Sequence, residues 1–280
     1  MKVANRMLIV AGLLALLAGC AGEPPKTAAV QGGKVEILYL GQSAMRITTP
    51  GGKVIVVDPW LTTNPTTPPE YKNLDALGKV DLVLVTHAHA DHFTDAPALA
   101  NKHKAQLVTP VGLNSTIVAL GIVPADLAFR MNMGGHATPI GGDIKITQVH
   151  AEHGSELRRA NPETKKTEVH VGGPAVGYII ELENGFTIYH MGDTGLFGDM
   201  RLIAARFKPD LVMIPIGGHN TMDPTDAAYA TNEFLKPKYA IPIHYGAAPL
   251  MMRTPQEYSL ALGGVSTTVF PLKPGEKVAF

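Results

Sequence analysis

The sequence predicts an α/β fold of the αββα sandwich type, in which two packed sheets carry helices on their outer faces. Three observations lead to this prediction. Short β-branched runs come first, and helical patterns are interleaved with strands only later. The second half of the chain repeats this order of predicted strands and helices. The 29 glycines and 22 prolines among 280 residues fit the many short turns of a strand-rich fold.

The first 19 residues are typical of a targeting segment. Two basic residues precede an apolar run over residues 7–18, which is too short to span a bilayer comfortably. The run ends at Cys20, the only cysteine of the chain, and resembles a bacterial lipoprotein signal. This implies cleavage before Cys20, lipidation of its thiol and a lipid anchor in the cell envelope, on the periplasmic or outer face of the membrane. Because Ala21 follows, we expect the outer membrane in a two-membrane bacterium. The alternative is an ordinary secretory signal.

Residues 20–33 form a flexible tether in this interpretation, and residues 34–280 form one domain. Three β-branched runs separated by glycine and proline predict strands at 35–40, 44–48 and 53–57. A loop rich in proline and threonine covers 60–69, and the apolar run 80–85 predicts a buried strand. A helix at 95–104, a strand at 106–108 and a helix at 112–120 complete the first half.

The second half repeats this arrangement. Apolar runs predict strands at 143–149, 175–182 and 186–189, then a helix at 199–207 and a strand at 210–214. The next helix, 223–235, has Asp223 as a plausible N-cap and Pro224 in its first turn. A strand at 239–243, a helix after Thr254, and strands at 267–270 and 277–280 close the chain.

A dense cluster of metal-binding residue types follows the strand predicted at 80–85. Residues 87–92 contain three imidazoles and a carboxylate, which suit a borderline divalent metal. In an extended strand end alternate residues point the same way, so His87, His89 and Asp91 can converge while His92 approaches from beside them. One metal would rarely need four ligands packed so tightly. The cluster therefore predicts a two-metal centre.

Further candidate ligands follow other predicted strands, where open sheets gather their functional residues. His153, Asp193 and His244 each stand at or shortly after a strand end, flanked by glycine or small residues. His150 competes with His153 for the same role, and we prefer His153 because of the Gly-Ser that follows it.

Two more residues have open roles. His219 lies in a loop placed to face the metals from the substrate side, as a substrate contact or a leaving-group acid, or else as a surface residue. Asp58 could hydrogen-bond a metal-bound histidine, or it could simply cap its turn.

The order His87-x-His89-x-Asp91-His92, His153, Asp193, His244 resembles the metallo-β-lactamase superfamily over residues 34–280. The resemblance implies a metallo-β-lactamase-like fold. His87, His89 and His153 would hold one metal, while Asp91, His92 and His244 hold the second and Asp193 bridges them. Local strings point to the branch of ascorbate-6-phosphate lactonase and N-acyl-phosphatidylethanolamine phospholipase D, among them Val57-Asp-Pro-Trp60, Gly192-Asp-Thr-Gly195 and Ile243-His-Tyr-Gly246.

The resemblance implies a hydrolase. Two metal ions would turn a bridging water into a hydroxide that attacks a small ester, lactone or phosphodiester, and Asp91 would guide a proton. Zinc is the expected metal, although manganese or iron accept the same nitrogen and oxygen ligands. The resemblance further implies a small-molecule or lipid-like substrate. The 24 basic and 24 acidic residues balance, so no nucleic-acid partner is expected, and the oligomeric state stays open.

Two other functions compete with this prediction. A non-catalytic, metal-binding envelope lipoprotein is the main alternative, and a β-lactamase is the weaker one because many of these use a cysteine ligand. Residues 156–167 are expected to form a polar loop at the mouth of the site. Their four basic side chains could attract a phosphate or lipid headgroup, or could simply be solvated.

Overall fold

The computed structural model describes residues 33–247, 249 and 251–280. The signal proposed for residues 1–19, Cys20 and nearly all of the tether lie outside the described residues, so these expectations remain predictions. Among the described residues, no helix combines the length and apolar character that crossing a membrane requires.

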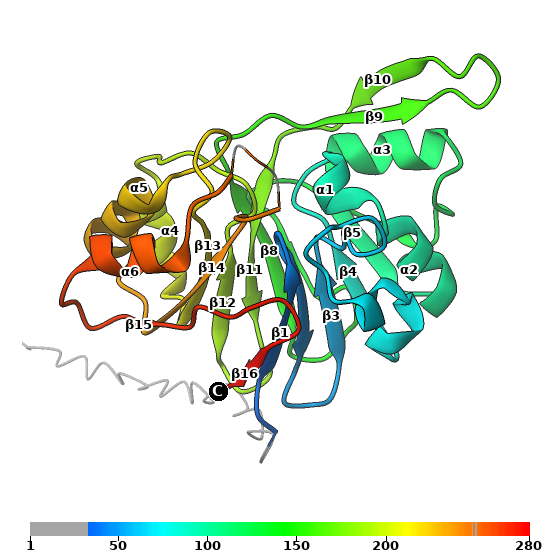
Figure 1. Ribbon diagram of the computed structural model, residues 1–280. Coiled ribbons are helices and arrows are strands. Elements are labelled where there is room, and N and C mark those ends of the chain that lie inside the picture. Colours follow the sequence, from blue (N-terminus) through cyan, green and yellow to red (C-terminus); the bar gives the residue numbers. More distant parts are fainter. Residues whose placement is uncertain (1–32, 248, 250) are drawn as a thin grey trace, which may run out of the picture.

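Two seven-stranded sheets follow the same plan and pack face to face (Figure 1). The first sheet has the order β16 (Lys277–Ala279), β1 (Glu36–Gly41), β2 (Ala44–Thr48), β3 (Val54–Val57), β4 (Leu82–Leu84), β5 (Gln106–Pro110) and β6 (Ala128–Met131). The second has the order β15 (Thr268–Val269), β14 (Tyr239–Ile243), β13 (Leu211–Pro215), β12 (Thr187–His190), β11 (Val176–Glu181), β8 (Lys145–His150) and β7 (His136–Ala137). Each sheet is half antiparallel and half parallel. Three antiparallel pairings join the strands from β16 to β3 in the first sheet and from β7 to β12 in the second, and three parallel pairings join the remaining strands of each sheet.

Helices cover the outer face of each sheet (Figure 1). The first sheet carries α1 (Ala90–Phe93), α2 (Ala96–His103) and α3 (Val111–Ala119), with short 3-10 turns at Pro69–Lys72 and Leu74–Leu77. The second carries α4 (Met200–Phe207), α5 (Pro224–Tyr229), a π-helical turn at Ala230–Leu235 and α6 (Pro255–Leu262). The predicted αββα sandwich is therefore confirmed.

The strands are apolar on both faces because both faces are covered. In β1, Ile37 and Tyr39 face the core between the sheets, whereas Leu38 and Leu40 face the helices of the first sheet. This alternation fixes the register, since a slip by one residue would exchange the two sets. The result is three apolar layers that hold the two sheets and their helices together.

The structure corrects the prediction of a polar loop over residues 156–167. A hairpin of β9 (Glu156–Ala160) and β10 (Thr167–Val171) projects from the body at the top of Figure 1. Its turn forms because the Asn161 side chain accepts hydrogen bonds from the backbone nitrogens of Glu163 and Thr164, both at 2.9 Å. Buried Leu157 packs the root of the hairpin against the apolar layer under the first sheet's helices.

Other differences are smaller. The sequence did not predict β6 and β7, and the helix expected at 223–235 divides into α5 and a π-helical turn. The parallel strands β3, β4, β12, β13 and β14 end on one edge of the sandwich, and the candidate residues follow those ends, except for His153, which follows β8. This edge is where open sheets place their sites.

Candidate metal centre

All seven predicted ligands meet at this edge, in two adjoining groups. Within each group, one nitrogen or oxygen of every side chain lies within 4.8 Å of those of the others. The chain segments that supply them lie far apart in sequence, so the fold, and not local sequence, assembles the centre. The groups are His87, His89 and His153, and Asp91, His92, Asp193 and His244.

The geometry expected for residues 87–92 was wrong in one respect. β4 ends at Leu84, and His89 is the N-cap residue of α1, so the segment is not an extended strand end. His87 and His89 face the first group, while the turn into α1 brings Asp91 and His92 to the second. One short segment thus serves both groups because it changes from a bend to a helix.

A buried carboxylate orients one histidine of the second group. Asp58 is fully buried, and its Oδ1 accepts a hydrogen bond from the Thr86 backbone nitrogen at 2.7 Å. Its Oδ2 accepts the Thr86 hydroxyl at 2.7 Å and lies 2.9 Å from Nδ1 of His92. An ionised carboxylate only accepts, so Nδ1 of His92 carries a proton and Nε2 is turned to the centre.

The same network orients a histidine of the first group. The Thr86 hydroxyl gives its one proton to Asp58, so it accepts from Nδ1 of His87 at 3.1 Å. The Nε2 atom of His87 is then an acceptor, and burial lowers the pKa of this ring, which keeps it neutral. Asp58 therefore acts on both groups, directly through His92 and through Thr86 on His87.

The first group brings two acceptor nitrogens together. Nε2 of His87 lies 3.0 Å from Nδ1 of His89. Oε2 of Glu156, at the root of the hairpin, lies 3.4 Å from Nε2 of His89, which favours a proton on that nitrogen and leaves Nδ1 as an acceptor. Two facing lone pairs repel unless a positive charge lies between or beside them. This arrangement fits a cation.

Asp193 lies between the groups. Its Oδ2 is 2.8 Å from Nε2 of His244 and 3.6 Å from Nε2 of His153, and its Oδ1 is 3.3 Å from Nε2 of His92. Among the described residues, Nε2 of His92, Nε2 of His244 and Oδ1 of Asp193 are buried, and although each lies within ion-pair distance of an oppositely charged group, none makes a hydrogen bond of good geometry. Buried polar atoms normally have partners, and a metal ion would satisfy all three of these.

Charges in the second group act strongly on one another. Burial raises the pKa of Asp193, but His244 and His92 outweigh burial and hold that pKa well below its usual value. Burial lowers the pKa of His244, yet Asp193 overrides this and raises it to about 9. Without metal the carboxylates therefore hold protons on these rings, in the place where a dication would bind.

The structure separates His150 from the centre. Its imidazole is 42% exposed, lies 3.2 Å from the Glu152 carboxylate and packs edge-on against Phe197. It belongs to neither group, whereas His153 belongs to the first.

His219 lies exposed, with a φ of 57°, on the loop that follows β13. This loop is tied to the centre, because a side chain at Gly217 would collide with the His244 carbonyl and because Met222 donates its backbone N–H to the Thr194 carbonyl at 2.9 Å.

Sequence reasoning missed three contacts of the centre. Thr86 and Glu156 orient histidines of the first group, and Gln42 donates from Nε2 to Oδ2 of Asp91 at 3.0 Å. Each is an ordinary polar residue, and only proximity in the fold gives it this role. A Gly-Gln pair between two predicted strands indicated a turn but no contact with residues far along the chain.

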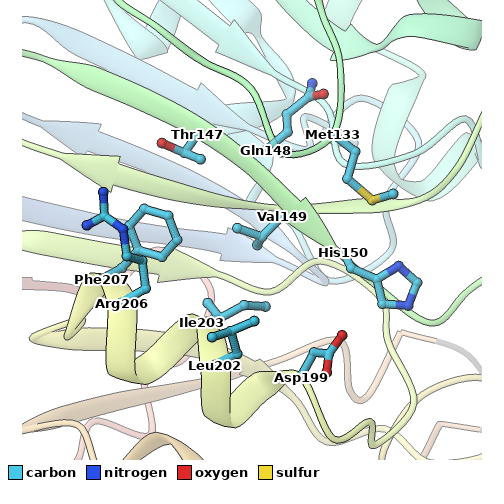
Figure 2. Close-up of a pocket in the computed structure, with 11 residues that line it drawn as sticks. Met133, Thr147, Gln148, Val149, His150, Asp199, Leu202, Ile203, Arg206 and Phe207 are labelled. Carbon is cyan, nitrogen blue, oxygen red and sulfur yellow. The ribbon is translucent and has the colours of Figure 1, made fainter.

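A separate groove of about 480 Å³ lies outside the centre, between β8 and α4 (Figure 2). Val149, Leu202, Ile203 and Phe207 supply much of its apolar lining, and His150 lies at one end beside Asp199 (Figure 2). None of the seven ligand-type side chains lines it.

The fold is that of the β-lactamase superfamily, and the sequence profile of the beta-lactamase superfamily domain matches residues 36–244. The chain is 60% identical to a UPF0173 metal-dependent hydrolase of Polaromonas sp., over 98% of both chains. It is 56% identical to one of Cupriavidus necator, over 98% of this chain and 99% of the relative. The chain belongs to the UPF0173 metal-dependent hydrolase family.

A solved structure agrees with this assignment. The metallo hydrolase Igni18 of Ignicoccus hospitalis superposes with a TM-score of 0.73 at 31% identity, covering 88% of this chain and 98% of that one. The prediction of a metal-dependent hydrolase is thereby confirmed.

Proposed function

We propose that this hydrolase uses two divalent metal ions to cleave a small ester, lactone or phosphodiester. The observation that carries the proposal is the pair of adjoining ligand groups with Asp193 between them. His87, His89 and His153 would hold one ion, Asp91, His92 and His244 the other, and Asp193 would bridge both. Five imidazoles and two carboxylates suit zinc, and also manganese or iron.

Two ions held in these groups would supply a hydroxide from water near neutral pH and polarise the scissile carbonyl or phosphoryl oxygen. The chain's own residues provide the rest. Asp91 is 29% exposed and borders the open side of the second group, where it can accept and pass on a proton. We propose His219, exposed on the loop after β13, as the residue that contacts substrate or protonates the leaving oxygen.

The substrate class follows from the local strings around Asp58, Asp193 and His244. They resemble the branch that contains ascorbate-6-phosphate lactonase and N-acyl-phosphatidylethanolamine phospholipase D. The hairpin of β9 and β10 supports a polar or lipid-like substrate, because it brings Arg158, 66% exposed, near the root residue Glu156 that touches His89.

A lipid anchor at Cys20 would place the enzyme in the cell envelope, on the periplasmic or outer face of the membrane. Metabolic labelling with a fatty acid tests this, with Cys20→Ser as the control. Label and membrane association that survive in Cys20→Ser would exclude the anchor.

A hydrolysis screen tests the function. The purified full-length protein is assayed on phosphodiesters, lactones and acyl esters, with and without chelator, beside Asp193→Ala and the exposed control Asp199→Ala. We expect one class to be cleaved by wild type and Asp199→Ala only, with activity lost to chelator and restored by metal. Cleavage that persists in Asp193→Ala or in chelator would refute the two-metal mechanism.

A further inference from the structure

Gln42 touches the second ligand group from the turn between β1 and β2. It is fully buried, with a φ of 55°, and its Nε2 lies 3.0 Å from Oδ2 of Asp91. A second contact runs from Nε2 to the Met251 sulfur at 3.9 Å. An ionised carboxylate can only accept, so the nitrogen of the carboxamide, and not its oxygen, must face Asp91.

The backbone of the same residue holds a second member of the group. The Gln42 carbonyl accepts a hydrogen bond from the His244 backbone nitrogen at 2.8 Å and one from the Tyr39 hydroxyl at 3.1 Å. Tyr39 is itself buried in the core between the sheets. The hydrogen bond from Tyr39 therefore fixes the backbone of Gln42 to the core between the sheets.

Asp91 needs such support more than its neighbours do. It lies on the four-residue helix α1 and is 29% exposed, whereas His92, Asp193 and His244 are at most 3% exposed. Its Oδ2, the atom that Gln42 contacts, also faces the group, at 3.7 Å from Nε2 of His92 and 3.5 Å from Nε2 of His244. Burial alone does not fix this carboxylate.

We propose that Gln42 is a positioning residue for the second metal: its carboxamide holds Oδ2 of Asp91 in the direction from which that oxygen binds the ion, and its carbonyl fixes His244. A neutral donor suits this task, because a lysine or arginine there would repel the cation. The inference rests on the proposed two-metal function.

The main variant is Gln42→Met, which keeps the length of the side chain and the backbone contact to His244 but removes the donor. Metal-free protein is titrated with zinc against a competing chelator, and with cobalt, whose absorption reports ligand geometry. We expect one of two ions to bind about 10–100-fold more weakly, the usual effect of removing a group that orients a ligand, with a changed cobalt spectrum. Ser43→Ala, a buried neighbour in the same turn, should match wild type.

A double-mutant cycle separates positioning from a general structural role. If Gln42 acts through Asp91, Gln42→Met causes no further loss of affinity in an Asp91→Asn background. Additive losses, or wild-type affinity in Gln42→Met, would overturn the proposal. Gln42→Asn, which tolerates the left-handed backbone but withdraws the amide by one methylene, should show the same loss if Gln42→Met folds poorly.

Failure of the proposed function looks different. If wild type binds only one ion, the two-metal function fails. The role of Gln42 is then decided by whether Gln42→Met and Asp91→Asn have non-additive effects on the affinity for that one ion. If wild type binds none, both are refuted.

Discussion

Replacing Asp58 with asparagine should disturb both metals at once, although the change preserves the shape of the side chain. The amide oxygen can still accept the Thr86 backbone N–H at the position of Oδ1. The new amide nitrogen, however, faces the Thr86 hydroxyl and Nδ1 of His92, where the carboxylate accepted two protons. The two groups that donated to Oδ2 of the carboxylate must therefore rearrange around a donor.

The rearrangement moves protons to the wrong nitrogens. The Thr86 hydroxyl must now accept from the new amide and turn its proton toward Nδ1 of His87, 3.1 Å away. Nδ1 of His92 must likewise become an acceptor. Both rings then carry their protons on Nε2, the atoms that face the two ligand groups, and each must lose that proton to bind a metal.

The expected loss is about 10–100-fold in affinity for each ion, which corresponds to about 1.4–2.8 kcal/mol at a factor of ten per 1.4 kcal/mol. Competition between the full-length metal-free protein and a zinc chelator measures it. A tenfold or greater loss at only one ion would show that Thr86 does not pass the effect on to His87.

Asp95→Asn is the matched control. Asp95 is 5% exposed and accepts hydrogen bonds from the backbone nitrogens of Leu61 and Thr62, at 2.6 and 3.0 Å, and from the Thr62 hydroxyl at 2.7 Å, in a loop that holds no ligand. It should lower the melting temperature but leave zinc affinity unchanged. Wild-type affinity in Asp58→Asn, or an equal loss in Asp95→Asn, would refute the reasoning.

Three further predictions follow from the centre. Glu156→Ala should weaken binding at the first group by up to about tenfold in the same competition assay, because the half-exposed carboxylate no longer keeps the proton of His89 on Nε2; an unchanged affinity would speak against this contact. His153→Ala should lower the zinc content found by elemental analysis while His150→Ala leaves it unchanged, and the reverse would exchange their roles. Zinc binding should strengthen as the pH rises from 6 toward 8, because the carboxylates raise the pKa of His244 to about 9 and a proton must leave before the ion binds; calorimetry in buffers of different ionisation enthalpy would contradict this if no proton were released.

The sequence predicted the fold because its signals were local. Apolar runs bounded by glycine and proline mark the strands, and their two-faced burial in β1 requires covering layers on both sides. The gathering of the candidate ligands was also predictable, since strand ends on one edge carry them. The prediction failed most clearly for one local element. The segment 156–167 is polar enough to look like a loop, yet Asn161 closes a turn and the flanking residues pair as a hairpin.

Of the residues that orient the candidate ligands, the sequence pointed only to Asp58, and it did not show which histidine Asp58 contacts. Gln42 and Asp91 are 49 positions apart, and Asp58 and His92 are 34 apart. No periodicity or spacing links such pairs, because only the packing of separate strand ends brings them together. The sequence favoured His153 over His150 only through the Gly-Ser that follows it. His150 ends β8 and His153 lies just beyond it, and only the three-dimensional course of the chain shows which ring reaches the centre.

Anomalous X-ray diffraction from crystals of the metal-loaded protein tests the central claim most directly. The two-metal proposal predicts two anomalous peaks per chain, one among His87, His89 and His153 and one between Asp91, His92 and His244, with Asp193 touching both. A single peak, no peak, or a metal bound away from these side chains would contradict it.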